Sequence, residues 1–427
     1  MFHSRAEEVA TVLAEHFPRD LADTVFAQRT ATVVLDIADC GRWSVEIVDG
    51  VAKLSAGPQP RPTCSIHCDA TTITDLLTGR RSGVEAFLAG DLIARGSLAT
   101  VLQLGGAFAP DIEVAARPQA REIEVAGART AYLEAGPSDA PPLVLLHGLG
   151  ATNASMLPLL SGLAAQHRVL APDIPGFGAS EAPRWDYSAQ QLCRWFHDFL
   201  SATDARGAAV VGNSLGGRLA LESAMSDPQA ASALVLLCPS PAFRRFRQLA
   251  PFVKLLPVDL ARISRVALTR PLMTAALRTL FADPRRVRKG WYDAALDEFE
   301  IAMSKGNRRR AALSALVNIY TEQAFGEKGF WERLRNVRCP TLFVWGGDDH
   351  LVPSAFERHV TDAIPSANSV VIPDCGHLPQ LEFPELTTRL VRRFIASSDY
   401  ARRRSARAGT TTPSATATPR SAANTRF

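Results

Sequence analysis

The sequence predicts an α/β protein in which a doubly wound, mostly parallel sheet follows a small α+β unit. Between residues 121 and 398, short apolar segments alternate with helical segments, as in a parallel sheet covered on both faces. Before residue 117, strand-like segments come first and helical periodicity follows, which is typical of an α+β layer. The length of 427 residues also exceeds one ordinary domain, so two folded units are expected.

The first unit, predicted over 1–116, begins with strands. Segments 30–38 and 42–53 are rich in β-branched residues, and Asp49-Gly50 within the second marks a hairpin turn. A third strand is expected at 63–68. Helical spacing follows in three groups of apolar residues: Ile73, Leu76 and Leu77; Val84, Phe87 and Leu88; and Leu98, Val101, Leu102 and Leu104.

Four short segments give this first unit a resemblance to a known domain. They are residues 43–50, 64–70, 76–79 and 89–96. Together they resemble the sterol-carrier-protein domain. The resemblance implies an apolar tunnel for fatty-acyl chains, sterols or similar lipids, whereas the alternative is that the same residues fill a core without ligand space.

The second unit, predicted over 121–398 after a linker at 117–120, alternates strands and helices. The predicted strands are 121–125, 130–135, 143–146, 168–171, 208–211, 233–237, 341–345 and 369–372. The predicted helices are 154–166, 188–203, 215–226, 354–364 and 386–397. The interval of about 240–335 lacks strand signals and predicts a helical lid, and the Ser-, Thr- and Arg-rich tail at 399–427 is expected to be disordered.

The strongest chemical signal lies in the segment VVGNSLGG at 210–217. It places G-x-S-x-G between an apolar strand and a helix, which is the context of a nucleophile elbow. The turn is strained at the serine, so small neighbours are needed, and glycines 212, 216 and 217 supply them. Ser214 is therefore the candidate nucleophile, and the alternative is a glycine-rich turn without chemistry.

A serine hydroxyl needs a base, and the base needs an acid to orient it. Of nine histidines, His377 follows a predicted strand and comes last in the chain order Ser, Asp, His that this arrangement uses. The loop after the strand at 341–345 offers two acids, Asp348 and Asp349. The chosen acid would fix the imidazole tautomer and stabilise imidazolium.

Four motifs spread over about 230 residues of the second unit resemble those of the α/β-hydrolase family. They are GNSLG at 212–216, WGGDDHLVP at 345–353, GHLP at 376–379 and HGLG at 147–150. The family pattern W-G-x-x-D-x-x-V-P selects Asp349 over Asp348. The turn H-G-x-G implies an oxyanion hole, for which the backbone N–H groups of Leu149 and Leu215 are the candidate donors. The loop DIPGFGAS at 173–180 also resembles the family, with Asp173 shaping the loop.

The resemblance implies a serine hydrolase that cleaves a hydrophobic carboxylic ester through an acyl-serine intermediate. Asn213 beside the serine also occurs in carbon–carbon bond hydrolases of ring-cleavage products, although those usually carry tryptophan where Leu378 stands. A third alternative is a non-catalytic lipid-binding or carrier protein. Fold alone does not choose among them.

Charge and cysteine content limit the partners, ligands and cellular compartment that we expect. The net charge is +4, but six arginines in the last 27 residues account for more than that, so no nucleic-acid groove is expected. Cys64, His67 and Cys68 lack a second ligand pair, and we predict no metal and no cofactor. Seven scattered cysteines favour free thiols, and the start lacks an apolar export signal, so a cytoplasmic protein is expected.

The expected ligand is a hydrophobic small molecule or a lipid. Between residues 240 and 290 there are twelve Lys or Arg and two acids, interleaved with apolar residues. This composition favours contact with anionic membranes or acidic substrates such as acyl-CoA, and its alternative is a solvated lid. The sequence leaves the oligomeric state open.

Overall fold

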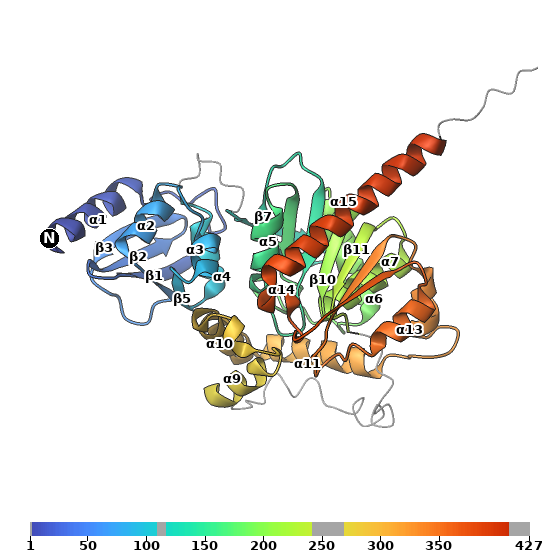
Figure 1. Ribbon diagram of the computed structural model, residues 1–427. Helices are drawn as coiled ribbons and strands as arrows, with labels where there is room; N and C mark the ends of the chain where they lie inside the picture. The colour runs from blue at the N-terminus through green and yellow to red at the C-terminus, as the bar shows by residue number, and fades with distance from the viewer. Residues whose placement is uncertain (1, 109–116, 241–268, 410–427) are drawn as a thin grey trace, which may run out of the picture.

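The chain folds around two β-sheets that lie side by side (Figure 1). The structure is a computed structural model, and it describes residues 2–108, 117–240 and 269–409. The first sheet has five strands in the order β3-β2-β1-β4-β5, and the second has eight in the order β13-β12-β11-β10-β8-β9-β7-β6. The strands of the first sheet lie between residues 30 and 96, and those of the second lie between residues 119 and 372.

The first sheet pairs its strands antiparallel except where β1 lies parallel to β4. Asp49 and Gly50 form the β2–β3 hairpin with positive φ angles of 47° and 81°, as a two-residue hairpin turn requires. The strands are β1 (Thr30–Ile37), β2 (Gly41–Val48), β3 (Val51–Ala56), β4 (Cys64–Cys68) and β5 (Ile93–Gly96). The helices are α1 (Phe2–His16), α2 (Ala70–Leu77), α3 (Gly83–Ala89) and α4 (Leu98–Gly105).

Two elements of this unit were not predicted, namely α1 and β5. The four residues of β5 are too few to show alternation, and β5 forms because it pairs with β4. Its formation places the N-terminus of α4 at the edge of the sheet.

The second sheet is parallel at its centre, with β8, β10, β11, β12 and β13 all aligned. Its strands are β6 (Gln119–Val125), β7 (Ala128–Ala135), β8 (Pro142–Leu146), β9 (Arg168–Pro172), β10 (Ala208–Asn213), β11 (Ala231–Leu237), β12 (Thr341–Gly346) and β13 (Asn368–Ile372). All eight predicted strands are present within two residues of their expected ends, and the predicted fold class is confirmed.

Helices cover both faces of this sheet because its strands are apolar on both sides. Along β8, Leu143 and Leu145 pack into a cluster with α5 and α15, whereas Val144 and Leu146 pack with α6 and α7. These helices are α5 (Leu157–Leu163), α6 (Ala189–Ala202), α7 (Leu215–Ser226), α13 (Phe356–Ala363), α14 (Pro379–Glu382) and α15 (Pro384–Gly409). Short 3-10 turns lie at Asn153–Met156, Pro284–Arg286 and Leu334–Asn336.

The described part of the insertion is helical, as predicted. It contains α9 (Arg270–Arg278), α10 (Lys289–Ser304), α11 (Gly306–Thr321) and α12 (Phe330–Arg333). In Figure 1, α9, α10 and α11 lie below the two sheets, and α10 reaches the first unit, where it packs against β5. Residues 241–268, which carry much of the basic composition of the predicted lid, lie outside the described residues.

The two units share one hydrophobic core. A single cluster of buried side chains includes Val33 and Leu104 of the first unit together with Leu145 and Val391 of the second. Contacts between α3 and α5, and between α4 and β6, carry the cluster across the boundary. The units are therefore packed together rather than only tethered.

The predicted disordered tail is wrong over part of its length. Helix α15 continues to Gly409, well past the expected start of the tail at residue 399. The segment YARRRSARA at 400–408 consists mostly of arginine and alanine, which are strong helix formers and extend a helix already nucleated on the sheet. The rest of the predicted tail, 410–427, lies outside the described residues.

Candidate active site

The candidate residues gather where the parallel strands of the second sheet end. Ser214 follows β10, Asp349 lies in the loop after β12, and His377 lies in the loop after β13. Since the carboxyl ends of parallel strands meet at one edge, three residues distant in sequence come to one place. All three side chains are buried or nearly so.

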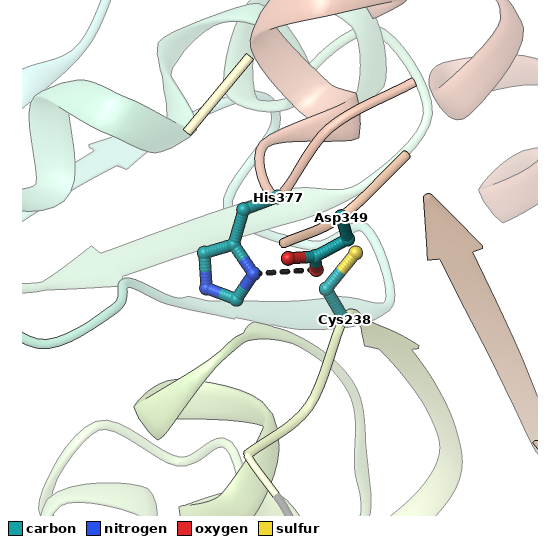
Figure 2. Close-up of side chains that lie close together, drawn as sticks. All are labelled: Cys238, Asp349 and His377. Atoms are coloured by element: carbon teal, nitrogen blue, oxygen red, sulfur yellow. Dashed lines mark hydrogen bonds and ion pairs between the residues drawn. The ribbon is translucent and has the colours of Figure 1, made fainter. Parts of the chain in front are cut away.

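Asp349 and His377 are joined by a hydrogen bond (Figure 2). Nδ1 of the imidazole donates to Oδ2 of the carboxylate at 2.7 Å. The other carboxylate oxygen accepts the backbone N–H groups of Leu351 and Val352, each at 2.8 Å. With Nδ1 held as the donor, Nε2 carries the lone pair, and this is the tautomer that a general base needs.

The structure separates the two candidate acids. Asp349 is 5% exposed and contacts His377, whereas Asp348 is exposed and binds the His377 loop only through its backbone N–H, which donates to Cys375. The preference for Asp349 that the sequence motif gives therefore agrees with the contact.

Ser214 stands in a strained backbone conformation between β10 and α7. Its φ of 52° and ψ of −111° are rare for a residue with a side chain. The turn is possible because its neighbours are glycines: a Cβ added to Gly212 would lie 2.5 Å from the carbonyl carbon of Gly216, and one on Gly216 would lie 2.3 Å from the oxygen of Leu146. The Ser214 side chain makes no capping hydrogen bond to α7, so its hydroxyl stays available.

Ser214 and His377 both line one cavity of about 740 Å³. Within the described chain no hydrogen bond joins the two side chains, a separation common in unliganded hydrolytic sites. Asn213 holds their backbones together, because its side-chain amide donates to the carbonyl oxygens of His377 at 3.2 Å and Leu237 at 3.0 Å. The cavity wall is mostly apolar.

The predicted oxyanion donors also lie at this cavity. Leu149 and Leu215 both line it, and Leu215 is the first residue of α7, where a helix N–H has no intrahelical acceptor. The HGLG loop passes close to the serine, since a Cβ added to Gly148 would lie 3.4 Å from Cβ of Ser214. The N-terminus of α7 adds partial positive charge at the same point.

His147 and Asp173 hold this loop from behind. Nδ1 of His147 donates to the Gly148 carbonyl at 2.8 Å, and its Nε2 accepts the Ile174 N–H at 2.9 Å. Full burial lowers the pKa of His147 to about 4, so the ring is neutral. Asp173 accepts the backbone N–H groups of Asn153 and Ala179, each at 2.7 Å, although burial raises its pKa to about 7. Both residues shape the loop, as the sequence predicts for Asp173.

Comparison with known proteins agrees with this architecture. The model of the alpha/beta hydrolase family matches residues 143–390, a stretch that contains all the candidate residues. The chain belongs to the α/β-hydrolase family. It is accordingly a hydrolase.

Relatives and structural neighbours of this hydrolase bear different names. It is 30% identical over 271 residues to the 2-hydroxy-6-oxo-6-(2'-aminophenyl)hexa-2,4-dienoic acid hydrolase of Metapseudomonas resinovorans, covering 62% of this chain and 87% of the relative. A crystal structure of a serine hydrolase involved in carbazole degradation matches with a TM-score of 0.53 and 26% identity, over 65% of this chain and 99% of that one. A candidate lipase of Acinetobacter baumannii AYE matches with a TM-score of 0.59 and 22% identity, over 71% of this chain and 96% of that one, which supports the fold alone.

One structural residue of the hydrolase escaped the sequence motifs, namely Glu382. Its fully buried carboxylate accepts the backbone N–H of Gly376, next to His377, at 2.8 Å, and those of Ala282 and Asp283 in the insertion. The N–H of His377 in turn donates to Leu280 at 2.7 Å. The sequence signal that could have identified Glu382 is an acidic residue within the mostly apolar segment LPQLEF at 378–383. The insertion thus helps to position the histidine loop.

Cys238 is a second unpredicted neighbour, and it lies beside the carboxylate of Asp349 (Figure 2). Its thiol, the Asp349 carboxylate and a nitrogen of His377 lie within 4.8 Å of one another, which is close enough to consider a metal. The donor set does not fit one. Burial raises the pKa of Cys238 well above its ordinary value, so the thiolate that a metal needs is disfavoured, and both Asp349 oxygens already accept N–H groups.

Proposed function

We propose that this hydrolase cleaves a hydrophobic carboxylic ester through an acyl-serine intermediate. Ser214 is the nucleophile, His377 the general base, and Asp349 the acid that orients it. The backbone N–H groups of Leu149 and Leu215 stabilise the oxyanion.

One observation carries this proposal. Ser214, whose hydroxyl makes no capping bond to α7, lines an apolar cavity together with His377, and His377 is hydrogen-bonded to Asp349. A cavity of about 740 Å³ is of the size that encloses a drug-sized ligand. Its mostly apolar wall suits a hydrophobic acyl or alcohol group.

The reaction follows from these positions. Ser214 Oγ attacks the ester carbon while Nε2 of His377 takes the hydroxyl proton, and the two backbone N–H groups bind the oxyanion. The C–O bond then breaks, and the departing alkoxide takes the proton from His377 and leaves as the alcohol. Water next attacks the acyl-serine with His377 again as the base, which releases the carboxylic acid and restores the serine.

A fluorophosphonate probe tests the nucleophile directly. The wild-type protein should be labelled, and Ser214→Ala should not. In a panel of p-nitrophenyl esters, Ser214→Ala should lose at least about 10³-fold in kcat. Ser240, which also lines the cavity, is the matched control, and Ser240→Ala should keep labelling. Equal labelling of wild type and Ser214→Ala would contradict the proposal.

A second candidate function is hydrolysis of a carbon–carbon bond in a ring-cleavage product. It is favoured by the relative from Metapseudomonas resinovorans, whose name specifies a hexadienoic acid hydrolase, and by Asn213 beside the serine. The two reactions are distinguished by supplying a 2-hydroxy-6-oxohexa-2,4-dienoic acid and detecting the two carboxylic fragments by mass spectrometry. Turnover of this acid at rates above those for esters would replace the ester proposal.

For the first unit we propose a structural relationship to sterol-carrier-protein domains, with boundaries at 1–116 and a hydrolase domain at 121–398. The proposal is supported by the resemblance of the four sequence segments, which lie in a five-stranded sheet and its helices. Lipid binding by this unit predicts that a fluorescent fatty acid binds Ser214→Ala as tightly as it binds wild type. A protein that binds lipid but is never labelled by the fluorophosphonate would be a carrier instead.

Contact with anionic membranes is also a proposal. Among described residues, no helix is long and apolar enough to cross a bilayer. Several arginines of the described insertion are engaged within the protein: Arg270 pairs with Asp297, Arg285 with Asp283, and Arg286 with Glu382. Flotation with neutral and anionic vesicles tests the proposal, and equal absence from both would end it.

A further inference from the structure

The cavity at Ser214 is not enclosed by the hydrolase unit alone. Besides Ser214 and His377, its wall includes Leu98, Ala99, Thr100 and Gln103 from the first unit. These residues form the first turns of α4 and come more than a hundred positions before the serine. The same space therefore touches the reacting group and a helix of the other unit.

Helix α10 of the insertion holds α4 against this cavity through two consecutive acids. Asp297 accepts Nε of Arg95 at 2.8 Å, Nη2 of Arg95 at 3.2 Å and the backbone N–H of Gly96 at 2.8 Å. The next acid, Glu298, accepts the backbone N–H of Ala99 at 3.1 Å. A two-pronged charge-assisted contact and a carboxylate at a helix N-terminus both fix orientation.

Close packing supports the same arrangement. Arg288, just before α10, lies on Gly90 so closely that a Cβ there would come within 2.9 Å of the arginine side chain. The Asp297 carboxylate, which is 9% exposed, also binds Arg270 of α9 at 2.8 Å. Because charged groups are rarely buried unless paired, these contacts mark a fixed contact between the units rather than a loose one.

Glu298 belongs both to the contact between α10 and α4 and to the wall of the cavity. Its side chain lines the cavity, and burial raises the pKa of its carboxyl group. The carboxyl group accepts the N–H of Ala99 at the N-terminus of α4, so this acid helps to position the wall. The neighbouring wall residues Leu98, Ala99 and Phe299 are apolar.

We propose that the first unit is part of the substrate-binding site, with the start of α4 forming the far wall and Asp297 and Glu298 acting as positioning residues. The inference rests on the proposed ester hydrolysis at Ser214 and extends it to substrate class. The substrate is an elongated ester whose apolar acyl chain runs from Ser214 to α4. Short esters occupy only the serine end and gain nothing from the first unit.

The experiment uses the full-length chain and compares p-nitrophenyl laurate with p-nitrophenyl acetate. Ala99→Trp fills the far end, and Ala10→Trp, on the exposed face of α1, places the same bulk on the same unit away from the cavity. In Ala99→Trp the ratio of kcat/KM for laurate to that for acetate should fall about tenfold or more, which is about 1.4 kcal/mol. In Ala10→Trp the ratio should stay at the wild-type value.

A second pair of variants tests the positioning contact should Ala99→Trp fail to fold. Arg95→Ala removes both hydrogen bonds to Asp297 and should raise KM for laurate more than for acetate. Arg95→Lys keeps one charged contact and should restore part of the ratio. A structural role alone would lower activity on both esters together.

The outcomes separate this inference from the function on which it rests. Failure of the fluorophosphonate to label the wild-type protein would reject the proposed function itself. A labelled protein whose laurate-to-acetate ratio is unchanged in both Ala99→Trp and Arg95→Ala would reject the shared wall while leaving the hydrolase intact. A wild type that prefers acetate over laurate would reject it as well.

Discussion

Helices α4 and α7 both contribute to the cavity wall, and each follows a serine, but the two serines behave differently. Ser97 precedes α4 in an extended conformation, with φ of −73°, and its hydroxyl accepts the N–H of Thr100 at 3.2 Å. Ser214 precedes α7 with φ of 52° and makes no such bond. Ser97 caps its helix, whereas the strained turn at Ser214 directs the hydroxyl away from its own helix.

The difference separates a serine that stabilises the fold from one that is available for chemistry. Ser82 and Ser188 also cap their helices in extended conformations. At Ser214 the absence of a capping bond goes together with backbone strain and glycine neighbours. The first unit, by contrast, contributes wall residues from an ordinary capped helix.

The largest effect is expected at Asp349, the proposed acid of the site. Asp349→Asn should lower kcat by about 10⁴-fold, because the amide cannot hold the imidazole in the required tautomer. Asp348→Asn is the matched control, since its exposed side chain makes no contact with His377, and it should change kcat by less than about twofold. Steady-state kinetics on a p-nitrophenyl ester decides, and equal losses in the two variants would refute the assignment.

The next prediction compares a glycine of α7 with a glycine of α4. Gly216→Ala in α7 would place a Cβ 2.3 Å from the Leu146 oxygen and should lower the free energy of unfolding by about 3 kcal/mol. Gly105→Ala in α4 meets nothing within 4 Å and should stabilise by about 0.5 kcal/mol. Urea denaturation measures both. A stable Gly216→Ala protein with full activity would show that the turn tolerates more space than its geometry allows.

A pH-dependent effect is expected from His147 behind the oxyanion loop. Its pKa is about 4 in the folded protein against an ordinary value of 6.5, so the unfolded chain binds a proton first as the pH falls. This contribution to stability is present above pH 6.5 and is lost toward pH 4, by about 2 kcal/mol between pH 7 and pH 5.

His147→Gln removes the titrating group. Its unfolding free energy should fall by about 2 kcal/mol less than that of wild type over this interval. His350→Gln, at an exposed position, serves as the control and should follow wild type. If His147→Gln instead showed the wild-type slope, the buried histidine would not be neutral in the fold.

The smallest effect tests the two serines themselves. Ser97→Ala removes a helix cap and should lower the free energy of unfolding by about 1 kcal/mol. Ser214→Ala removes no cap, so its stability should stay within about 0.5 kcal/mol of wild type while activity is lost. Thermal and urea unfolding of both variants measure this, and equal destabilisation would undo the distinction.

Much of the second unit could be predicted from the sequence because its signals are local. Each central strand is apolar throughout, and each candidate residue stands in a short motif directly after a strand. The expected end of the last helix, in contrast, was wrong, because α15 continues through the arginine- and alanine-rich segment to Gly409. Composition alone does not reveal that a helix already nucleated on a sheet extends into such a segment.

Other features could not be predicted because they depend on distant contacts. Strand β5 exists through its pairing with β4, and Glu382 binds backbone groups of a segment about a hundred residues away. Nothing around Asp297 in the sequence indicates that it meets Arg95, 202 positions earlier.

The sequence by itself determined the parallel sheet, the order of its motifs and the residue types of the candidate site. These follow from periodicity and from turn chemistry, which act over a few neighbouring residues. Only the tertiary structure decided that Glu382 binds the loop before His377 and which helix of the first unit lines the cavity. Those outcomes depend on how separate elements pack, and packing joins residues whose positions in the chain carry no record of their contact.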